Sequence, residues 1–234
     1  MLTFNFNNID LPSGAKILDV GCGEGRHIFG SLQAFKQAYC VGYDQHIPSL
    51  NICKDGLAFF QELDSGATIF VQGSVYKLPF EDNSFDLIFC SEVLEHLDDY
   101  HLALDEIHRV LKSGGKFLPS VPSFWPEKIC WMLSIDYQNM PGGHVRIFKK
   151  NQVISEITNH GFVYEKSERF HGLHSAYWWL RCIFWKTQES NWLVRQYKEF
   201  LEYQILQNPS WLKKIENCMN PIFGKSIAFY FQKK

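Results

Sequence analysis

The first half of the chain alternates short apolar runs with longer amphipathic segments. The runs, each bounded by turn-forming residues, are KILDV (16–20), YCVGYD (39–44), ATIFVQGS (67–74) and FDLIFCS (85–91). Runs of this length and composition are typical of buried parallel strands. Helices are predicted between them, over 26–37, over 47–63 and from the end of the fourth run to 111. Strands and helices alternating at this spacing predict an α/β sandwich around a parallel sheet.

The second half of the chain is less regular. We expect a fifth strand from 114, a helix over 149–161, a sixth strand over 163–170 and a last strand over 225–232. The connection 123–148 contains Pro, Gly and aromatic residues and is too long for an ordinary loop of an α/β unit. About fifty residues after the sixth strand are predicted to be helical. The pattern therefore predicts a regular sheet with two large insertions.

A glycine-rich loop, ILDVGCGEGRH (17–27), follows the first predicted strand. A dinucleotide fingerprint, G-x-G-x-x-G, would need a third glycine where Arg26 stands, and a P-loop would need a different spacing and a lysine. The pattern that remains is D-x-G-x-G-x-G, made by Asp19, Gly21, Gly23 and Gly25. The glycines let a ligand lie against bare backbone at the carboxyl edge of the sheet.

Two acids indicate which ligand the loop holds. Asp44 ends the second predicted strand, 25 residues after Asp19, where a carboxylate can accept hydrogen bonds from both ribose hydroxyls. Asp19 would repel a phosphate but attract an ammonium group, directly or through water. We therefore expect a ligand with a ribose and a positively charged end, without a pyrophosphate.

Composition narrows the class of protein. Net charge is only −2, which gives no sign of a nucleic-acid partner, and seven scattered cysteines without a C-x-x-C pair indicate reduced, cytoplasmic usage rather than a disulfide frame or a zinc site. No secretory signal and no apolar run of membrane-spanning length is apparent. Residues 171–234 hold nine Lys/Arg, four Glu and five of the seven tryptophans. Such a tail suits a packed helical core or a membrane surface, so any membrane contact is expected to be peripheral at most.

The motifs together resemble class I S-adenosylmethionine-dependent methyltransferases, and are similar to the ubiquinone and menaquinone biosynthesis group (methyltransferase type 11). The resemblance rests on ILDVGCGEGRH, VGYDQ, LPFEDNSFDLIFCSEVLEHLDD and RVLKSGGKFLPSVP, which occur in the family's order within residues 16–122. It implies a Rossmann-like, seven-stranded, mostly parallel sheet with helices on both faces. It also implies S-adenosyl-L-methionine as the cofactor.

The resemblance assigns residues to this cofactor. Asp19, Gly21 and Gly23 would line its methionyl end, Asp44 would hold the ribose, and Gln45 would flank the adenine. Many relatives have an acid after the third strand, but here Ser74 stands there, and Val75 could add its backbone N–H. The other positions expected near the cofactor are Cys22, packed under the loop, with Gly25, Ser91 and Glu92.

Methyl transfer to a hydroxyl or an activated carbon requires a base, for which histidine is the commonest choice. His96, just past the fourth strand, and His144, in the pattern HVR, are the candidate catalytic residues. His171 and His174 could also reach the mouth of the site. No metal site is expected, because no His/Asp/Glu group has ligand spacing along the chain.

The chain is expected to form one domain, 1–234. Its core would comprise 14–122, 145–170 and 222–232, and its aromatic, helical cap would comprise a first insertion (123–144) and a second insertion (171–221) between the last two strands. An aromatic cap favours a small, lipophilic acceptor methylated on oxygen or carbon. A methyltransferase-like binding or regulatory subunit without turnover, or a protein methyltransferase, is the alternative, and the oligomeric state stays open.

Overall fold

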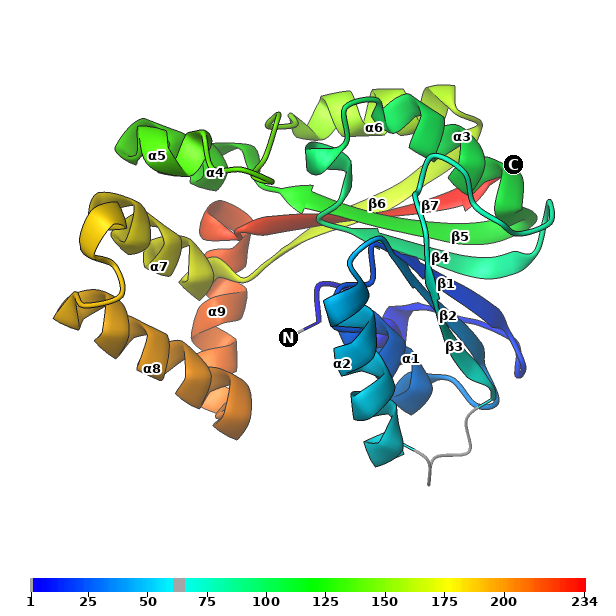
Figure 1. The fold of residues 1–234 in the computed structure, drawn as a ribbon, viewed down its shortest axis with the longest axis horizontal. Helices are drawn as coiled ribbons and strands as arrows, with labels where there is room; N and C mark the ends of the chain where they lie inside the picture. Colours follow the sequence, from blue (N-terminus) through cyan, green and yellow to red (C-terminus); the bar gives the residue numbers. More distant parts are fainter. Residues whose placement is uncertain (1, 61–65) are drawn as a thin grey trace.

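The computed structural model describes residues 2–60 and 66–234 and contains one sheet of seven strands (Figure 1). The strand order is β3-β2-β1-β4-β5-β7-β6. All neighbouring strands are parallel except at β7, which runs antiparallel to both β5 and β6. The strands are β1 (Lys16–Val20), β2 (Tyr39–Asp44), β3 (Thr68–Gln72), β4 (Phe85–Ser91), β5 (Leu111–Pro122), β6 (Phe162–Phe170) and β7 (Ser226–Lys233). This confirms the mostly parallel, seven-stranded sheet predicted from the sequence.

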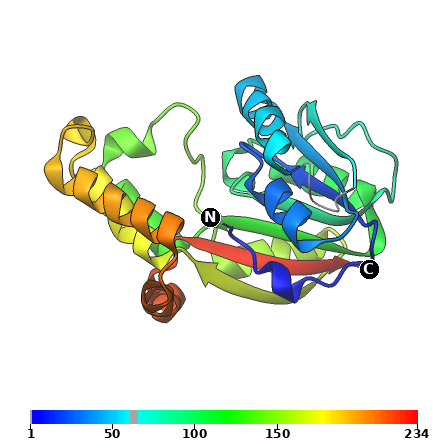
Figure 2. The same ribbon diagram turned by 90° about the horizontal axis from the view of Figure 1, so that it is seen from below.

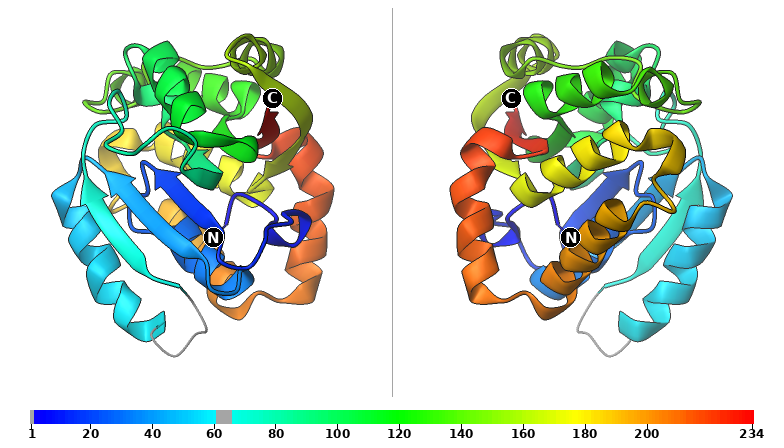
Figure 3. Two further views of the ribbon diagram at one scale, coloured as in Figure 1. Left: turned by 90° about the vertical axis from the view of Figure 1, so that its right-hand side faces the viewer. Right: turned by 90° about the vertical axis from the view of Figure 1, so that its left-hand side faces the viewer.

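Helices cover both faces of this sheet (Figure 3). The α-helices are α1 (Arg26–Ala34), α2 (Ile47–Leu57), α3 (Tyr100–Val110), α4 (Phe124–Leu133), α5 (Ile135–Gln138), α6 (Lys150–Asn159), α7 (Gly172–Ile183), α8 (Trp192–Gln207) and α9 (Ser210–Phe223). Short 3-10 turns are η1 (Phe6–Asn8), η2 (Ala58–Phe60), η3 (Leu94–His96) and η4 (Trp185–Thr187). The expected helix over 47–63 ends earlier, at Leu57, and positions 61–63 lie outside the described residues.

The predicted helix after β4 is wrong in its start. Instead of running on from the strand, the chain makes η3 and then begins α3 at Tyr100. The side chain of Asp99 accepts a hydrogen bond from the backbone N–H of His101, which caps the new helix at its N-terminus. His96 therefore lies on a separate short turn at the carboxyl edge of the sheet.

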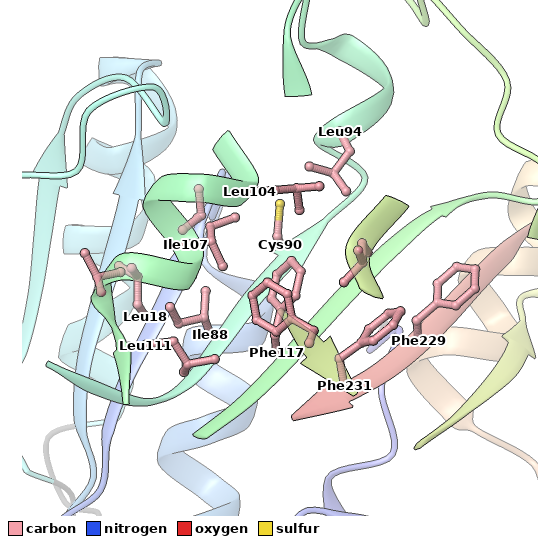
Figure 4. Packing of buried hydrophobic residues seen from close by; sticks show 14 of the residues in the cluster. Leu18, Ile88, Cys90, Leu94, Leu104, Ile107, Leu111, Phe117, Phe229 and Phe231 are labelled. Carbon is pink, nitrogen blue, oxygen red and sulfur yellow. The ribbon is translucent and has the colours of Figure 1, made fainter. Parts of the chain in front are cut away.

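Alternation along the strands creates two cores, one on each face of the sheet. On one face, α3 and α6 pack on side chains such as Leu18, Ile88 and Phe117 (Figure 4). On the other face, α1 and α2 pack on Ile17, Phe89 and their neighbours. Successive strand residues point to opposite faces, so an apolar run without alternation has to be buried on both sides.

The cap gathers at one end of the sheet, beyond the ends of the parallel strands (Figures 1 and 2). Helix α7 packs against α4, α8 and α9, so the two insertions contact each other although residues 145–170 separate them in sequence. Across the residues that the structure describes, no helix combines the length and apolarity needed to cross a membrane.

Candidate functional site

A cavity of about 770 Å³ lies at the carboxyl edge of the sheet. Residues that follow β1, β2, β3 and β4 form one side of it, and Trp131 of α4 with the segment 138–145 forms the other. This is the edge at which open α/β sheets bind their ligands, and the volume is that of a small-molecule site. The cavity therefore joins the sheet to the first insertion.

The glycine loop brings backbone, rather than side chains, to this cavity. Gly21 has φ +70°, and a Cβ there would collide with the side chain of Val93. Gly23 donates its backbone N–H to the carboxylate of Asp44 over 2.8 Å, and His46 donates its own to the other oxygen over 2.8 Å. Asp44 is thus fixed against the loop while it lines the cavity.

Asp19 is a buried acid that lacks a hydrogen-bond donor among the described residues, although Nδ1 of His27 lies 3.8 Å from its Oδ2. Its side chain is 1% exposed, and neither carboxylate oxygen has a hydrogen-bond partner among residues 2–60 and 66–234. Burial raises the pKa of Asp19 to about 8, against the opposing influence of the Arg26 guanidinium. A buried carboxylate without a donor is costly unless a cation or donor meets it.

A polar chain links the glycine loop to the end of β4. Arg26 donates to the hydroxyl of Ser91 over 2.9 Å, and Ser91 bonds to Ser120 over 2.8 Å. Ser120 in turn donates to the carboxylate of Glu92 over 3.1 Å. Glu92 lines the cavity and has φ +56°, a left-handed conformation that is strained for a non-glycine residue and is concentrated at functional sites.

His144 is held by a buried carboxylate. Its Nδ1 lies 2.7 Å from Oε1 of Glu127, which also accepts a hydrogen bond from the hydroxyl of Tyr137 over 2.8 Å. The ammonium of Lys225 lies 3.5 Å from the other oxygen of Glu127. Burial alone would raise the pKa of Glu127, but the hydrogen bond from His144 and the charge of Lys225 lower it to about 2. Glu127 is therefore an ionised acceptor that leaves Nε2 of His144 to face other groups.

The second histidine, His96, packs edge-to-face against His144, with ring centroids 4.9 Å apart, and both residues line the cavity. Its Nδ1 lies 3.1 Å from the carbonyl oxygen of Gly143. Burial and the neighbouring imidazole lower the pKa of His96, so it is neutral at neutral pH. Glu95 is fully buried, with Oε1 4.0 Å from Nε2 of His144, and burial raises the pKa of Glu95 well above its usual value.

Arg146 explains how the HVR pattern positions His144. Its guanidinium donates to the carbonyl oxygens of Leu94, Leu97 and Asp98, so the segment carrying His144 is tied to η3 and the residues that follow it. The backbone N–H of Val145 donates to the carbonyl of Glu95 over 3.0 Å and strengthens this attachment.

The structure brings most, but not all, of the predicted site residues to one cavity. Those that line it are Gly21, Asp44, Gln45, Ser74, Val75, Glu92, His96 and His144. Those that do not line it are Asp19, Cys22, Gly23, Gly25 and Ser91. Their roles toward the cofactor stay predictions.

The second insertion does not line this cavity in the part of the chain that the structure describes. Its aromatic residues instead form an internal core with the first insertion: Trp178, Trp179 and Trp185 pack around Tyr137 and two cysteines. The indole N–H of Trp179 donates to the carbonyl of Pro126 over 3.0 Å. The expectation that His171 and His174 reach the mouth of the site is not supported, because neither lines the cavity.

Sequence reasoning missed Glu127, Tyr137, Glu95 and Arg146 as parts of the site. Glu127 alone carried a usable signal, as the acid in an otherwise mostly apolar segment, FWPEKICWML. The others are joined to the histidines only by the folding of the first insertion over the sheet.

Part of the chain is similar in sequence to known methyltransferases. Residues 18–118 match the family model for a methyltransferase domain. The chain is 37% identical over 111 residues to sterol 24-C-methyltransferase of Gibberella zeae, covering 47% of this chain and 28% of the relative. It is 31% identical over 125 residues to demethylmenaquinone methyltransferase of Staphylococcus epidermidis, covering 50% of each. The chain thus spans half or less of the length of these curated relatives.

The solved structure of the YcgJ protein from Bacillus subtilis shares the fold over almost the whole chain. Its TM-score is 0.61 at 18% sequence identity, with 98% of this chain and 96% of that chain covered. This family implies S-adenosylmethionine as its cofactor. Residues 18–118 thus match a methyltransferase domain, and the chain as a whole shares the fold of this solved structure.

Proposed function

We propose that this chain transfers a methyl group from S-adenosylmethionine to an oxygen or carbon atom of a small, lipophilic acceptor. The observation that carries the proposal is the single cavity shared by the loop after β1, by Asp44 and by the pair His96 and His144. One cavity that contacts both a cofactor loop and a histidine pair can align two reactants, which is the main requirement for displacement at a methyl group.

The residues present fit the amino-acid end of this cofactor. Asp19 offers a buried carboxylate that lacks a donor among the described residues, and Arg26, whose charge acts on it, offers a guanidinium at the same loop. An acid and a base side by side match the ammonium and carboxylate of a methionyl group. A pyrophosphate would fit this pair of side chains less well, because an ionised Asp19 would repel it.

The residues also fit the nucleoside end. Asp44 keeps lone pairs available beside its two backbone donors and can accept from ribose hydroxyls. Gln45, Ser74 and Val75 line the cavity next to it, where Ser74 can accept from or donate to an adenine. Hydrogen bonds of this kind to a charged group contribute about 1.5–3 kcal/mol each.

The chain itself supplies a base. When bound, the cofactor supplies an electrophilic methyl group on a sulfonium whose leaving group is a neutral thioether. Glu127 accepts from Nδ1–H of His144 and so fixes the tautomer whose Nε2 can take a proton. The carboxylate also stabilises the imidazolium that results. We assign His144 as the general base and His96 as a neutral neighbour that positions the acceptor.

A lipophilic acceptor is favoured by the surfaces of the first insertion. Trp131, Met140 and Val145 line the cavity opposite the cofactor residues. The cap also exposes large apolar side chains on α4, α8 and α9, including Trp125, Leu206 and Trp211, and such surfaces are typical of contact with lipids or partners. The names of the relatives, a sterol and a demethylmenaquinone methyltransferase, support the same acceptor class. A peripheral membrane contact of a cytoplasmic protein is consistent with this proposal.

The test is to incubate the purified chain with cofactor carrying a labelled methyl group and an extract of lipids and metabolites. We expect label in the organic-soluble small-molecule fraction, lost with His144→Ala. Label confined to polar metabolites would contradict the lipophilic acceptor. Label in protein or nucleic acid, or none in any fraction, would contradict the proposed reaction.

A further inference from the structure

A second cluster of ligand-type side chains lies in the cap, away from the cavity. His171 follows β6 directly and precedes α7, His174 lies on the first turn of α7, and Glu216 lies on α9. Each offers one ligand atom, and the three atoms lie within 4.8 Å of one another. None of the three residues lines the cavity described above.

These side chains carry polar atoms that the rest of the described chain leaves unsatisfied. Nε2 of His171, Nδ1 of His174 and Oε1 of Glu216 are buried, and residues 2–60 and 66–234 give none of them a hydrogen-bond partner. His171 is only 9% exposed. Three such atoms in one place are costly unless a shared ligand satisfies them.

The surroundings fix the three residues in place. His171 has φ +67°, a left-handed conformation that is uncommon for residues other than glycine. The side chain of Asn220 accepts from the backbone N–H of Gly172 over 2.8 Å, which holds α9 against the start of α7. Gln204 of α8 donates to the second oxygen of Glu216 over 2.7 Å and orients that carboxylate, as supporting groups commonly do for metal ligands.

We propose that His171, His174 and Glu216 bind a divalent transition-metal cation, with Zn²⁺ as the first candidate. Two imidazole nitrogens and one carboxylate oxygen are a ligand set that zinc accepts, with a fourth position left for water. The cation would join the end of β6, the start of α7 and α9, and would thereby clamp the second insertion to the sheet.

The test measures metal content and affinity, and is independent of methyl transfer. The purified full-length chain, freed of loosely bound ions by gel filtration, is analysed by mass spectrometry for metals and then titrated with Zn²⁺ and Co²⁺ after chelation. We expect about one equivalent of cation per chain and a Co²⁺ visible spectrum typical of low coordination number. Removal of the cation should lower the thermal midpoint.

Matched variants locate the cation. His174→Ala and the near-isosteric Glu216→Gln should each raise the Kd for Zn²⁺ by at least about 100-fold, while His46→Ala, an exposed histidine, should not change it. Circular dichroism checks whether each variant folds. If His174→Ala does not fold, Glu216→Gln alone carries the test. No cation in the wild type, which would leave a bound water as the shared partner, overturns the proposal. Loss of the cation with His144→Ala but not with Glu216→Gln overturns it too, since ligand atoms of Glu95, His96 and His144 also lie close together.

Discussion

Two buried carboxylates, one in the sheet and one in the cap, have opposite environments. Asp19, near the end of β1, is 1% exposed and lacks a hydrogen-bond partner within the described chain, and its pKa is raised to about 8. Glu127 in α4 is equally buried but bonds to His144 and Tyr137, and its pKa is lowered to about 2. The sheet therefore holds a buried acid without a hydrogen-bond donor, for which we propose a cationic ligand, whereas the cap holds an acid already bonded to His144, the base that we propose.

The largest effect is expected from removing His144, the proposed base that bonds to Glu127. His144→Ala should lower kcat about 10²–10⁴-fold, the usual contribution of a general base. Affinity for S-adenosylmethionine should change little, because the cofactor residues come from the sheet. Steady-state kinetics with the acceptor found by labelling, together with calorimetry, would measure both quantities. Equal losses in kcat with His46→Ala, an exposed histidine, would argue against a specific role.

Replacing Asp19 should raise the stability of the ligand-free protein but weaken its binding of the cofactor. Asp19 has a folded-state pKa above its usual value of 3.8, so its ionisation opposes folding increasingly as pH rises from about 4 to about 8. Asp19→Asn should therefore stabilise the ligand-free protein at pH 7, by up to about 4 kcal/mol at 1.36 kcal/mol per pKa unit. It should also weaken cofactor binding. Denaturant unfolding at pH 5 and pH 8 would show the difference, and lower stability of Asp19→Asn at pH 8 would refute it.

Glu127 should give the reverse pH dependence of stability. The folded-state pKa of Glu127 lies below its usual value of 4.5, so its stabilising contribution is complete above about pH 4.5 and is lost as pH falls toward about 2. Glu127→Gln should remove about 3 kcal/mol of that contribution at pH 7 and flatten the acid limb of the stability profile between pH 4.5 and 2. An unchanged acid limb in thermal or denaturant unfolding would contradict the assignment.

The smallest effect is expected inside the cap core. Trp179→Phe keeps an aromatic side chain, although a smaller one, and removes the N–H that donates to Pro126; the lost hydrogen bond should cost about 1 kcal/mol. For a chain of this size that corresponds to about 2–4 °C in Tm. Cofactor affinity should stay unchanged, because neither residue lines the cavity. A tenfold loss of affinity in calorimetry would show that the two regions are coupled more tightly than the contacts indicate.

Local patterns predicted the sheet well and the cap poorly, for a physical reason. The strands and the D-x-G-x-G-x-G loop are recognisable because burial on both faces and positive φ restrict which residues can stand there. Asp44 and Gly21 were found in this way. Glu127 and His144 meet only because the first insertion folds over the sheet, and Trp178 and Trp179 turn inward because α4 packs against α7. Such contacts join residues that are distant in sequence, so no local sequence pattern predicts them.

We propose that the sheet builds the cofactor site and that the first insertion supplies the base. The most direct test is a set of calorimetric titrations of S-adenosylmethionine into the wild type, His144→Ala and Asp44→Ala. The wild type and His144→Ala should bind at one site with similar Kd, and Asp44→Ala should bind about 10–100-fold more weakly through the lost ribose contacts. Asp55→Ala, which removes an exposed acid of α2, serves as the matched control. No binding by the wild type, or an equal loss of affinity in His144→Ala and Asp44→Ala, would contradict a cofactor site built by the sheet and a base supplied from outside it.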